Sequence, residues 1–327
     1  MKDPSSNFII AFQVLPIIIF VSALSSLLHY WGIIQKCIQA FSFVLSRFLK
    51  IDGATSFGVA SSVFFGIIEG PLLIKSFLNN FNRSSLFIIM TASMATVAGT
   101  VMVLYSSILS GVIPNAATQI LTASIMSAPA AIMFAELIIP YRAPETSDGR
   151  VPDAKSQSES AIEAIINGTS EGVVMVLHIT GVLIVIFALI SLVNMGLFSI
   201  TGIDGLSIEK IVGYLFAPFC WLMGIESSEV LQAGELMGTK FIANEFVSYT
   251  KLAALTGMSS KSKLILTYAM CGFANLGSLG ILVGGLGQIM PEKKAMIGKL
   301  VTKSLFVGTL ATMFSGLVIG IVQSLFS

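Results

Sequence analysis

A carboxylate interrupts an apolar segment early in the chain, in the run GIIEGP at residues 66–71. The apolar arms beside it, residues 55–68 and 72–81, are each shorter than the roughly 20 residues that a helix needs to cross a bilayer core. Because Pro71 follows a glycine, one continuous helix through this point is disfavoured. The pattern predicts a re-entrant hairpin of two half-helices with Glu69 at its tip, near the membrane midplane. An ionisable residue at that depth indicates a functional site.

The composition supports a polytopic membrane protein. Apolar residues make up 55% of the chain and charged residues 11%, and the mean hydropathy is +0.91, far outside the range of a soluble domain. A net charge of +1 gives no electrostatic footprint for a nucleic acid. The sequence has neither a zinc-type Cys/His cluster nor a phosphate-binding glycine loop.

The first half of the chain contains spans on both sides of the predicted hairpin. Residues 8–33 are long enough for one span, and residues 35–49 form an amphipathic pattern typical of a helix in the membrane interface. After the hairpin, residues 84–109 and 113–139 each predict a further span. Residues 141–160 are polar and rich in Pro and Ser, which predicts a solvated cytoplasmic linker.

The second half repeats this plan. After the linker, residues 161–172 predict a short surface helix and residues 173–197 a span; residues 206–221 then predict a second amphipathic helix. Residues 225–255 follow, with Glu245 inside apolar sequence as a second hairpin carboxylate, and residues 264–290 and 296–325 predict two last spans. We therefore predict an all-α polytopic membrane protein with inverted repeats. The predicted division is a scaffold span (1–32), repeat 1 (33–140), the linker (141–160), a scaffold span (161–200) and repeat 2 (201–327).

The placement of lysine and arginine favours the inverted orientation. Cytoplasmic loops carry an excess of these residues, and a first hairpin that enters from the cytoplasm places most of them inside. The exceptions, predicted to lie outside, are Lys2, Lys210, Lys240, Lys251, Lys261 and Lys263.

Six stretches of the chain are similar to those of the concentrative nucleoside transporters. They are AFQVLP (11–16), GIIEGPLLIKSFL (66–78), ATVAGTVMVLY (95–105), GYLFAPFCWLMGI (213–225), AGELMGTKFIANEFVSY (233–249) and CGFANLGSLGILVGGLG (271–287). They occur in the family's order along nearly the whole chain. The resemblance implies a homotrimeric, ion-coupled importer of the inner (cytoplasmic) membrane, in which a mobile body with both hairpins slides against a fixed scaffold in an elevator-type movement. The implied partners are a nucleoside and lipid; no cofactor is implied besides a coupling ion, H⁺ or Na⁺.

The resemblance also assigns substrate contacts. Glu245, Asn275 and Ser278 match residues that hold the ribose hydroxyls in the family, Phe273 matches an aromatic neighbour of the site, and Glu69 matches the carboxylate on the nucleobase side. The residue types suit this role, because sugar hydroxyls both donate and accept, and a carboxylate with an amide can satisfy both. The alternative for Asn and Ser is structural, since both also connect helices within membranes.

The chain departs from the family's pattern near the first hairpin. Where family members often have Gly-Gln-Thr-Glu, Ile67 and Ile68 replace the amide and the hydroxyl, so we expect an apolar wall against the base. Ser62 stands where sodium-coupled members tend to have Asn, which favours proton coupling. Thr96 stands near the other expected sodium ligands, so sodium stays open. Ser62, Thr96 and Glu69 are the predicted ion-coupling residues, without a firm metal site.

Other readings also stay open. Family members usually carry further spans ahead of the segment where this chain begins. Together with Ile67 and Ile68, this feature keeps two alternatives open: a truncated or non-transporting relative, and a transporter of a different nucleoside-like solute. A membrane-embedded hydrolase that uses Glu69 and Glu245 as a carboxylate pair is disfavoured, because no further catalytic constellation accompanies them. We therefore predict a transporter and not an enzyme.

Overall fold

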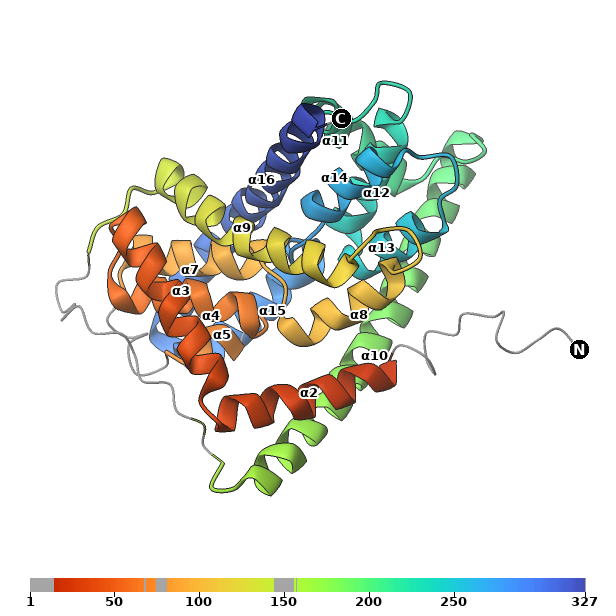
Figure 1. The fold of residues 1–327 in the computed structure, drawn as a ribbon. Coiled ribbons are helices and arrows are strands. Elements are labelled where there is room, and N and C mark those ends of the chain that lie inside the picture. Colours follow the sequence, from red (N-terminus) through yellow and green to blue (C-terminus); the bar gives the residue numbers. More distant parts are fainter. Residues whose placement is uncertain (1–14, 68, 75–80, 144–155, 157, 327) are drawn as a thin grey trace, which may run out of the picture.

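The computed structural model describes residues 15–67, 69–74, 81–143, 156 and 158–326, and within these ranges every regular element is a helix (Figure 1). In the first half the elements are α2 (Leu15–Tyr30), α3 (Ile33–Leu49), α4 (Gly53–Phe64), α5 (Glu69–Leu72), α7 (Arg83–Ala95), α8 (Gly99–Leu109) and α9 (Ala116–Ile138). In the second half they are α10 (Ala161–Thr201), α11 (Ile208–Leu222), α12 (Val230–Ile242), α13 (Glu245–Ala254), α14 (Ser260–Ala269), α15 (Leu276–Ile289), the 3₁₀ turn η2 (Pro291–Lys293) and α16 (Lys294–Phe326). The prediction of an all-α fold is confirmed.

The same order of elements occurs twice. In the first half, α3 is followed by the pair α4 and α5, the broken pair α7 and α8, and the long helix α9. In the second half, α11, the pair α12 and α13, the broken pair α14 and α15, and α16 follow in the same order. Each half therefore combines one hairpin-like pair with one interrupted helix.

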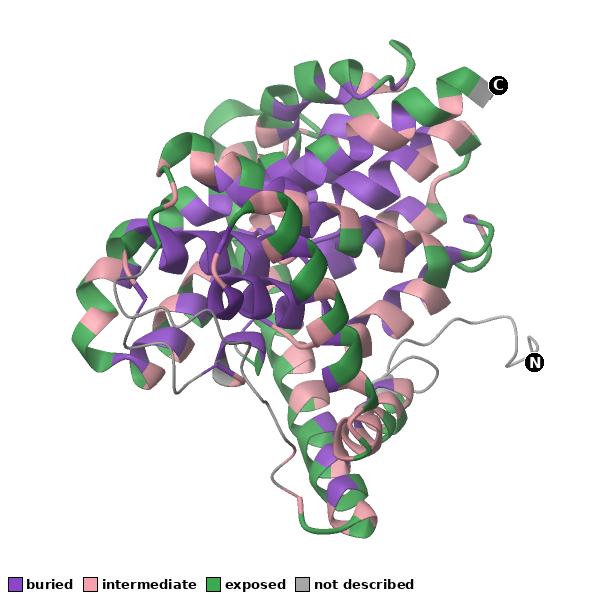
Figure 2. Ribbon diagram, turned by 60° about the vertical axis from the view of Figure 1, so that its left-hand side comes forward, coloured by how far each residue is buried: buried purple, intermediate pink, exposed green. Residues whose placement is uncertain are grey.

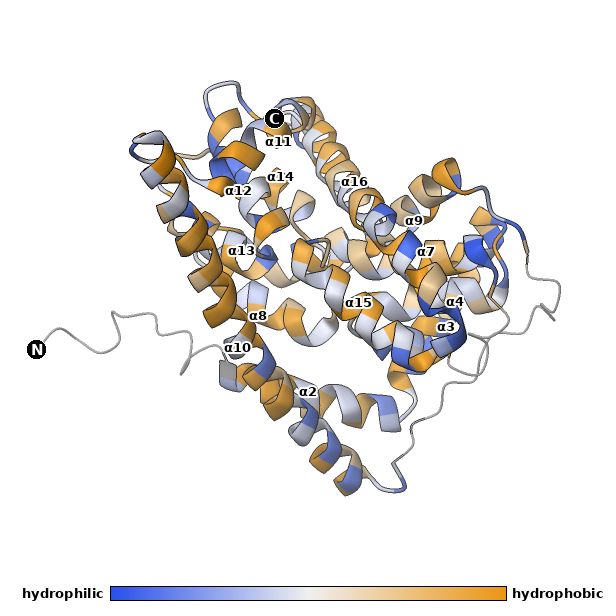
Figure 3. Cartoon of the chain, turned by 180° about the vertical axis from the view of Figure 1, so that it is seen from behind, coloured by the Kyte–Doolittle hydropathy of each residue, from blue (hydrophilic) through white to orange (hydrophobic). Residues whose placement is uncertain are grey.

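Several helices have the length and composition of membrane spans. Among the described residues there are four: Arg83–Leu109, Ala116–Ile138, Ala161–Thr201 and Pro291–Leu325. A further pair, α2 with α3, passes the same test but bends by 75° between Tyr30 and Ile33. Apolar residues cover α10 along most of its length (Figure 3). These helices support a multi-pass membrane protein.

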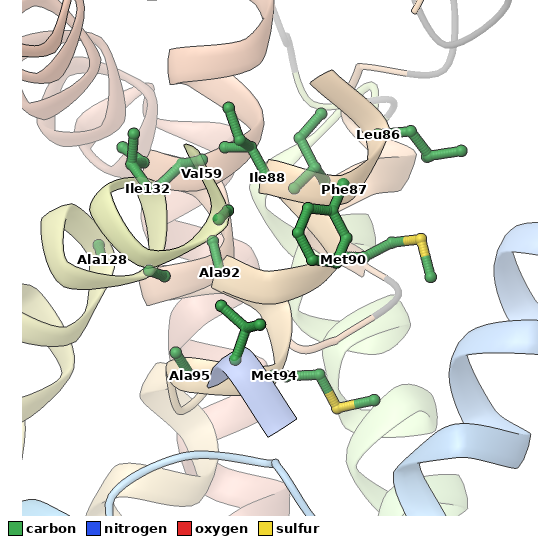
Figure 4. Close-up of a cluster of buried hydrophobic side chains, with 14 of the residues drawn as sticks. Val59, Leu86, Phe87, Ile88, Met90, Ala92, Met94, Ala95, Ala128 and Ile132 are labelled. Atoms are coloured by element: carbon green, nitrogen blue, oxygen red, sulfur yellow. The ribbon is translucent and has the colours of Figure 1, made fainter. Parts of the chain in front are cut away.

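Two clusters of buried apolar side chains form the core, which lies in the middle of the molecule (Figure 2). The first joins α4, α7 and α9 to α15 and α16, and side chains such as Val59, Phe87 and Ile132 interdigitate within it (Figure 4). The second joins α8 to α11, α12, α13 and α14. Phe273, in the break between α14 and α15, packs against both clusters. The two halves therefore meet at the interrupted helices.

Helix α10 packs against α2 through small residues (Figure 1). A Cβ atom on Gly168 would lie 2.6 Å from Cβ of Ser26, and one on Gly172 would lie 2.7 Å from Cα of Ile19. Such small residues, spaced four apart, let two helices approach closely within a membrane. Glycines 168 and 172 therefore form a packing stripe.

Two predictions about individual helices are wrong, and a third holds with an interruption. The surface helix at 161–172 and the span at 173–197 form one helix, α10, because these glycines pack against α2 without ending the helix. The span predicted at 264–290 is interrupted at residues 270–275. The span predicted at 84–109 is found at Arg83–Leu109, with a break in its helix at residues 96–98. The start of the first span before residue 15, part of the first hairpin's returning arm and most of the linker lie outside the described residues.

Candidate substrate and ion site

Glu245 lies where the second hairpin breaks. Helix α12 ends at Ile242 and α13 begins at Glu245, and between them Asn244 is extended and accepts a hydrogen bond from the Val247 amide at 2.9 Å. This cap uses the Asn244 side chain and leaves Glu245 as the first residue of α13, where the positive end of the helix dipole stabilises a carboxylate. Glu245 is only 4% exposed.

Two side chains from other elements hold the Glu245 carboxylate. The Tyr105 hydroxyl of α8 donates to Oε1 at 2.6 Å, and the Asn275 amide donates to Oε2 at 3.2 Å. A carboxylate has about four lone-pair positions, so these two bonds leave acceptor capacity on both oxygens. Glu245 can therefore accept hydrogen bonds from two further hydroxyl groups.

Asn275 and Ser278 complete this group. The Asn275 carbonyl oxygen caps α15 by accepting from the Ser278 amide at 2.9 Å, and it also accepts from the Ser278 hydroxyl at 3.1 Å. Because the carbonyl oxygen has these donors, the network assigns the amide nitrogen to the side that faces Glu245. The structure thus joins Glu245, Asn275 and Ser278, three of the predicted substrate residues, in one hydrogen-bonded group.

A second polar group connects the end of α4 with the end of α7. The Thr96 hydroxyl donates to the Ser62 carbonyl at 3.0 Å, and the Ser62 hydroxyl shares a hydrogen bond of 3.0 Å with that of Ser93. All three residues are buried. The structure therefore brings the predicted ion-coupling residues Ser62 and Thr96 together, and it adds Ser93, which the sequence did not indicate.

The oxygens of this second group are neutral, a donor type that suits a monovalent cation better than a transition metal. The described part of the chain contains no group of three or more His, Cys, Asp or Glu residues that could hold a metal ion. The group lies beside the first one, because the Phe273 amide donates to the Thr96 carbonyl at 3.3 Å.

The first hairpin places its carboxylate differently. Helix α4 ends at Phe64 and α5 begins at Glu69, and the Ser61 hydroxyl closes the turn by donating to the Gly70 carbonyl at 3.0 Å. Glu69 is exposed, whereas Ile67 is buried in the first apolar cluster. Ile68 lies outside the described residues. No hydrogen bond joins Glu69 to Glu245 in the described part of the chain.

Two residues of the site were missed in the sequence. Tyr105 is the donor closest to Glu245, yet it was noted only as the end of the stretch ATVAGTVMVLY. Lys240, predicted to lie on the outer side of the membrane, is fully buried in the last turn of α12, which the sequence did not indicate. Its position within the apolar run GTKFIANEF, five residues before Glu245, was the available signal.

The group around Glu245 is closed in this conformation. Glu245, Asn275 and Ser278 are each at most 6% exposed. A surface cavity lined by Arg83, Met296, Lys299 and Leu300 contains none of the predicted site residues. The three side chains are thus largely shielded from solvent.

Broken helix pairs with a buried carboxylate at a hairpin break define a membrane transporter of the inverted-repeat class. Residues 119–320 match the family described as "Na+ dependent nucleoside transporter C-terminus", and residues 11–112 match a domain described as "Nucleoside recognition". The chain belongs to the concentrative nucleoside transporter family. This confirms the resemblance and the prediction of a transporter and not an enzyme.

Individual relatives agree with this assignment. The chain is 37% identical to the nucleoside permease NupC of Helicobacter pylori, over 96% of this chain and 76% of that protein. It is 31% identical to sodium/nucleoside cotransporter 1 of Oryctolagus cuniculus, of which it spans 51%. Among solved structures, CNTnw in an inward-facing substrate-bound state matches with a TM-score of 0.89 and 31% identity, over 97% of this chain and 76% of CNTnw. A CNTnw variant in an outward-facing state matches with a TM-score of 0.86, 31% identity and coverage of 98% and 76%.

Proposed function

We propose that the protein takes up nucleosides, and that Glu245, Asn275 and Ser278 hold the hydroxyls of the sugar. The observation that carries this proposal is the buried Glu245 carboxylate, which Tyr105 and Asn275 orient while both of its oxygens keep acceptor capacity. Two adjacent sugar hydroxyls supply the donors that such a carboxylate lacks. The related permease of Helicobacter pylori, which is described as a nucleoside permease, supports the same substrate class.

The nucleobase is proposed to lie on the side of the first hairpin, against Ile67, Ile68 and Glu69. Ile67 has an apolar side chain at this hairpin, where it packs in the first cluster, and an apolar wall distinguishes ligands less strictly than a wall that must form hydrogen bonds. Phe273, which packs between the two core clusters, is proposed to contact the substrate from the break between α14 and α15.

A cation is proposed to drive uptake, because the family is described as Na⁺ dependent. We propose that this cation is H⁺. The hydroxyl of Ser62 is engaged with Ser93 and with the Gly58 carbonyl, at 3.0 Å each, where sodium-coupled members tend to offer the amide oxygen of an asparagine. Glu69, which is exposed, is proposed to take part in the coupling with Ser62 and Thr96.

The transport cycle is proposed to be an alternating-access, elevator-type movement. CNTnw has been captured in inward-facing, outward-facing and intermediate states, and the closed group around Glu245 requires some such movement for access. A homotrimer in the inner (cytoplasmic) membrane is proposed as the functional assembly, in keeping with the exposed apolar surface of α10.

Uptake into reconstituted vesicles tests these proposals. A panel of labelled nucleosides would be presented with a sodium gradient alone, a proton gradient alone, or both. We expect uptake driven by an inward proton gradient, with alkalinisation of the medium. Full uptake driven by sodium alone at symmetric pH would contradict proton coupling, and absence of uptake under every gradient would contradict nucleoside transport.

The variant Glu245→Gln tests the site itself. It removes a charged acceptor but keeps the shape, and because hydrogen bonds to charged groups contribute about 1.5–3 kcal/mol, affinity should fall about tenfold or more. Glu226→Gln, an exposed glutamate outside the helices of the same hairpin, is the control. Unchanged uptake kinetics in Glu245→Gln would remove the residue from the site.

A further inference from the structure

Lys240 is a fully buried cation inside the second hairpin. Its relative exposure is 0%, and its ammonium nitrogen has no hydrogen-bond partner within the described part of the chain. An ammonium group buried without compensation is costly. Since its side chain does not reach the surface in this conformation, a negative charge nearby would stabilise its charged form.

The compensating charge is that of Glu245. Lys240 lies in the last turn of α12 and Glu245 in the first turn of α13, on the two sides of the hairpin break. The two side chains act on each other electrostatically. Each also lies at the helix end whose dipole favours its own sign, a cation at the C-terminus and an anion at the N-terminus. The break thus places two opposite charges and two opposite helix ends near each other, without a direct ion pair or hydrogen bond between Lys240 and Glu245.

The other groups that act on Glu245 carry no positive charge. Tyr105 approaches from α8, Asn275 from the break between α14 and α15, and Tyr249 and Cys271 from α13 and from the end of α14. All four are neutral side chains at ordinary pH. Among these groups, Lys240 therefore supplies the positive charge that keeps the carboxylate ionised.

Among its described residues, the first hairpin has no cation at the equivalent position. The last turn of α4 contains no basic residue, and Phe64 occupies the position five residues before Glu69. Glu69 is also exposed, so water can solvate its charge. The two hairpin carboxylates are consequently held in opposite ways, one by a buried lysine and the other by solvent.

We propose that Lys240 is the internal counter-charge for Glu245. It holds the carboxylate in the ionised form that accepts sugar hydroxyls, so Glu245 keeps this role without taking up a proton during the cycle. Lys240 is thus a positioning residue that acts on the substrate through Glu245. This inference rests on the proposed function of Glu245 as the sugar acceptor, and it assigns the proton of the coupling step to another group.

Nucleoside binding to the purified protein, measured by calorimetry with uridine between about pH 6 and about pH 9, tests the proposal. Wild-type affinity should vary little between about pH 6 and about pH 7.5, where Lys240 keeps its charge. In Lys240→Met the carboxylate takes up a proton more readily, since an ionised form without a counter-charge is disfavoured by burial. Affinity should then be about tenfold or more weaker near neutral pH and should recover as the pH rises.

Two further variants separate this role from a merely structural one. Lys240→Arg keeps the charge and should retain the flat pH profile. Lys251→Met is the matched control, because this lysine of the same hairpin bonds to Glu209 and Thr239 and not to Glu245. It should also leave the profile flat. A flat profile with wild-type affinity in Lys240→Met would overturn the proposal.

A melting experiment gives a result that does not depend on transport. Lys240→Met and Glu245→Gln should each lower the melting temperature by leaving one buried charge unpaired, whereas the double variant should recover much of the loss. Additive losses would overturn the charge pair. If wild type binds no nucleoside but the losses are non-additive, the pair is real and the proposed substrate is wrong.

Discussion

The amide of Phe273 donates a hydrogen bond of 3.3 Å to the carbonyl of Thr96, and this bond connects the two interrupted helices. One residue lies in the break between α14 and α15, and the other ends α7. The bond connects the first repeat to the second at the point where both leave helical geometry. It also places the neutral oxygens around Ser62 next to the group around Glu245.

The close approach of the two helix breaks leaves no space for a side chain at residue 272. A Cβ atom there would lie 2.8 Å from the carbonyl oxygen of Ala95 and 2.8 Å from a methyl group of Thr312. We expect Gly272→Ala to lower the free energy of unfolding by about 1–3 kcal/mol, the usual cost of overpacking. Gly280→Ala is the control, since a Cβ there meets nothing within 4 Å. Thermal melts of the two purified variants provide the measurement. Equal melting temperatures would contradict the close approach of the two helix breaks at Gly272.

Tyr105→Phe removes the hydroxyl that donates to Glu245 but keeps the ring, which lies 5.1 Å from that of Tyr249. The carboxylate loses one of its two orienting partners, so we expect affinity for the nucleoside to fall by about tenfold, as for a hydrogen bond to a charged group. Tyr249→Phe is the control: its hydroxyl donates to the Thr267 carbonyl at 2.8 Å, so its loss should lower stability more than affinity. Equal binding constants for wild type and Tyr105→Phe would show that Tyr105 does not orient the acceptor.

The proposed site should be strict about the sugar and permissive about the base. Removing a ribose hydroxyl leaves Glu245 or Asn275 unpaired in a buried group, whereas an apolar wall discriminates bases by only about 1–3 kcal/mol. Restoring polar side chains with Ile67→Gln and Ile68→Thr should sharpen base preference and leave sugar preference unchanged. Competition of deoxynucleosides and base variants against labelled uridine measures both. If the wild type separates purines from pyrimidines strongly but tolerates loss of the hydroxyls, the sugar side and the base side of the site are assigned in reverse.

Tyr141 connects the loop after α9 to the start of α4. Its hydroxyl donates to the Asp52 carboxylate and accepts from the Asp52 amide at 3.0 Å. Burial, together with this hydrogen bond, raises the pKa of Tyr141 above its usual range. A raised pKa means that the folded state favours the protonated phenol, so its contribution to stability is present below about pH 10 and is lost as the pH rises further.

The variant Tyr141→Phe should therefore be less stable than wild type by about 1–3 kcal/mol at neutral pH, with a smaller difference at alkaline pH. Thermal melts of both proteins at a series of pH values, compared as a difference, separate this tyrosine from the others. A difference that does not change with pH would contradict its role as a protonated donor to Asp52.

The hairpin breaks could be predicted because their signals are local. Pro71 and two carboxylates inside apolar sequence mark them directly. The breaks at residues 96–98 and 270–275 were missed because neither contains a proline. Tertiary partners stabilise them: the Ser124 hydroxyl of α9 accepts from the Val97 amide at 3.1 Å, and Thr96 accepts from Phe273. Such partners cannot be read from the segment itself.

Lys240 shows a second limit of sequence reasoning. Lysine is rarely buried, so a lysine beside a predicted hairpin is assigned to the surface. Only the folded hairpin shows that the ends of α12 and α13 bring it to Glu245. The site residues Glu245, Asn275 and Ser278 were found through the family's motif and are joined by hydrogen bonds in the structure, but their role toward a substrate stays a prediction.

Helix α10 has 41 residues, which corresponds to a length of roughly 61 Å. The hydrocarbon layer of a bilayer is about 30 Å thick, so α10 is about twice as long as a perpendicular span. Its polar first turns extend beyond that layer, but the apolar remainder from Gly172 to Thr201 still measures roughly 45 Å. Inclination of the helix or local thickening of the bilayer accommodates such an excess length. Because packing between helices sets the inclination, the close contact of α10 with α2 determines how this excess is accommodated.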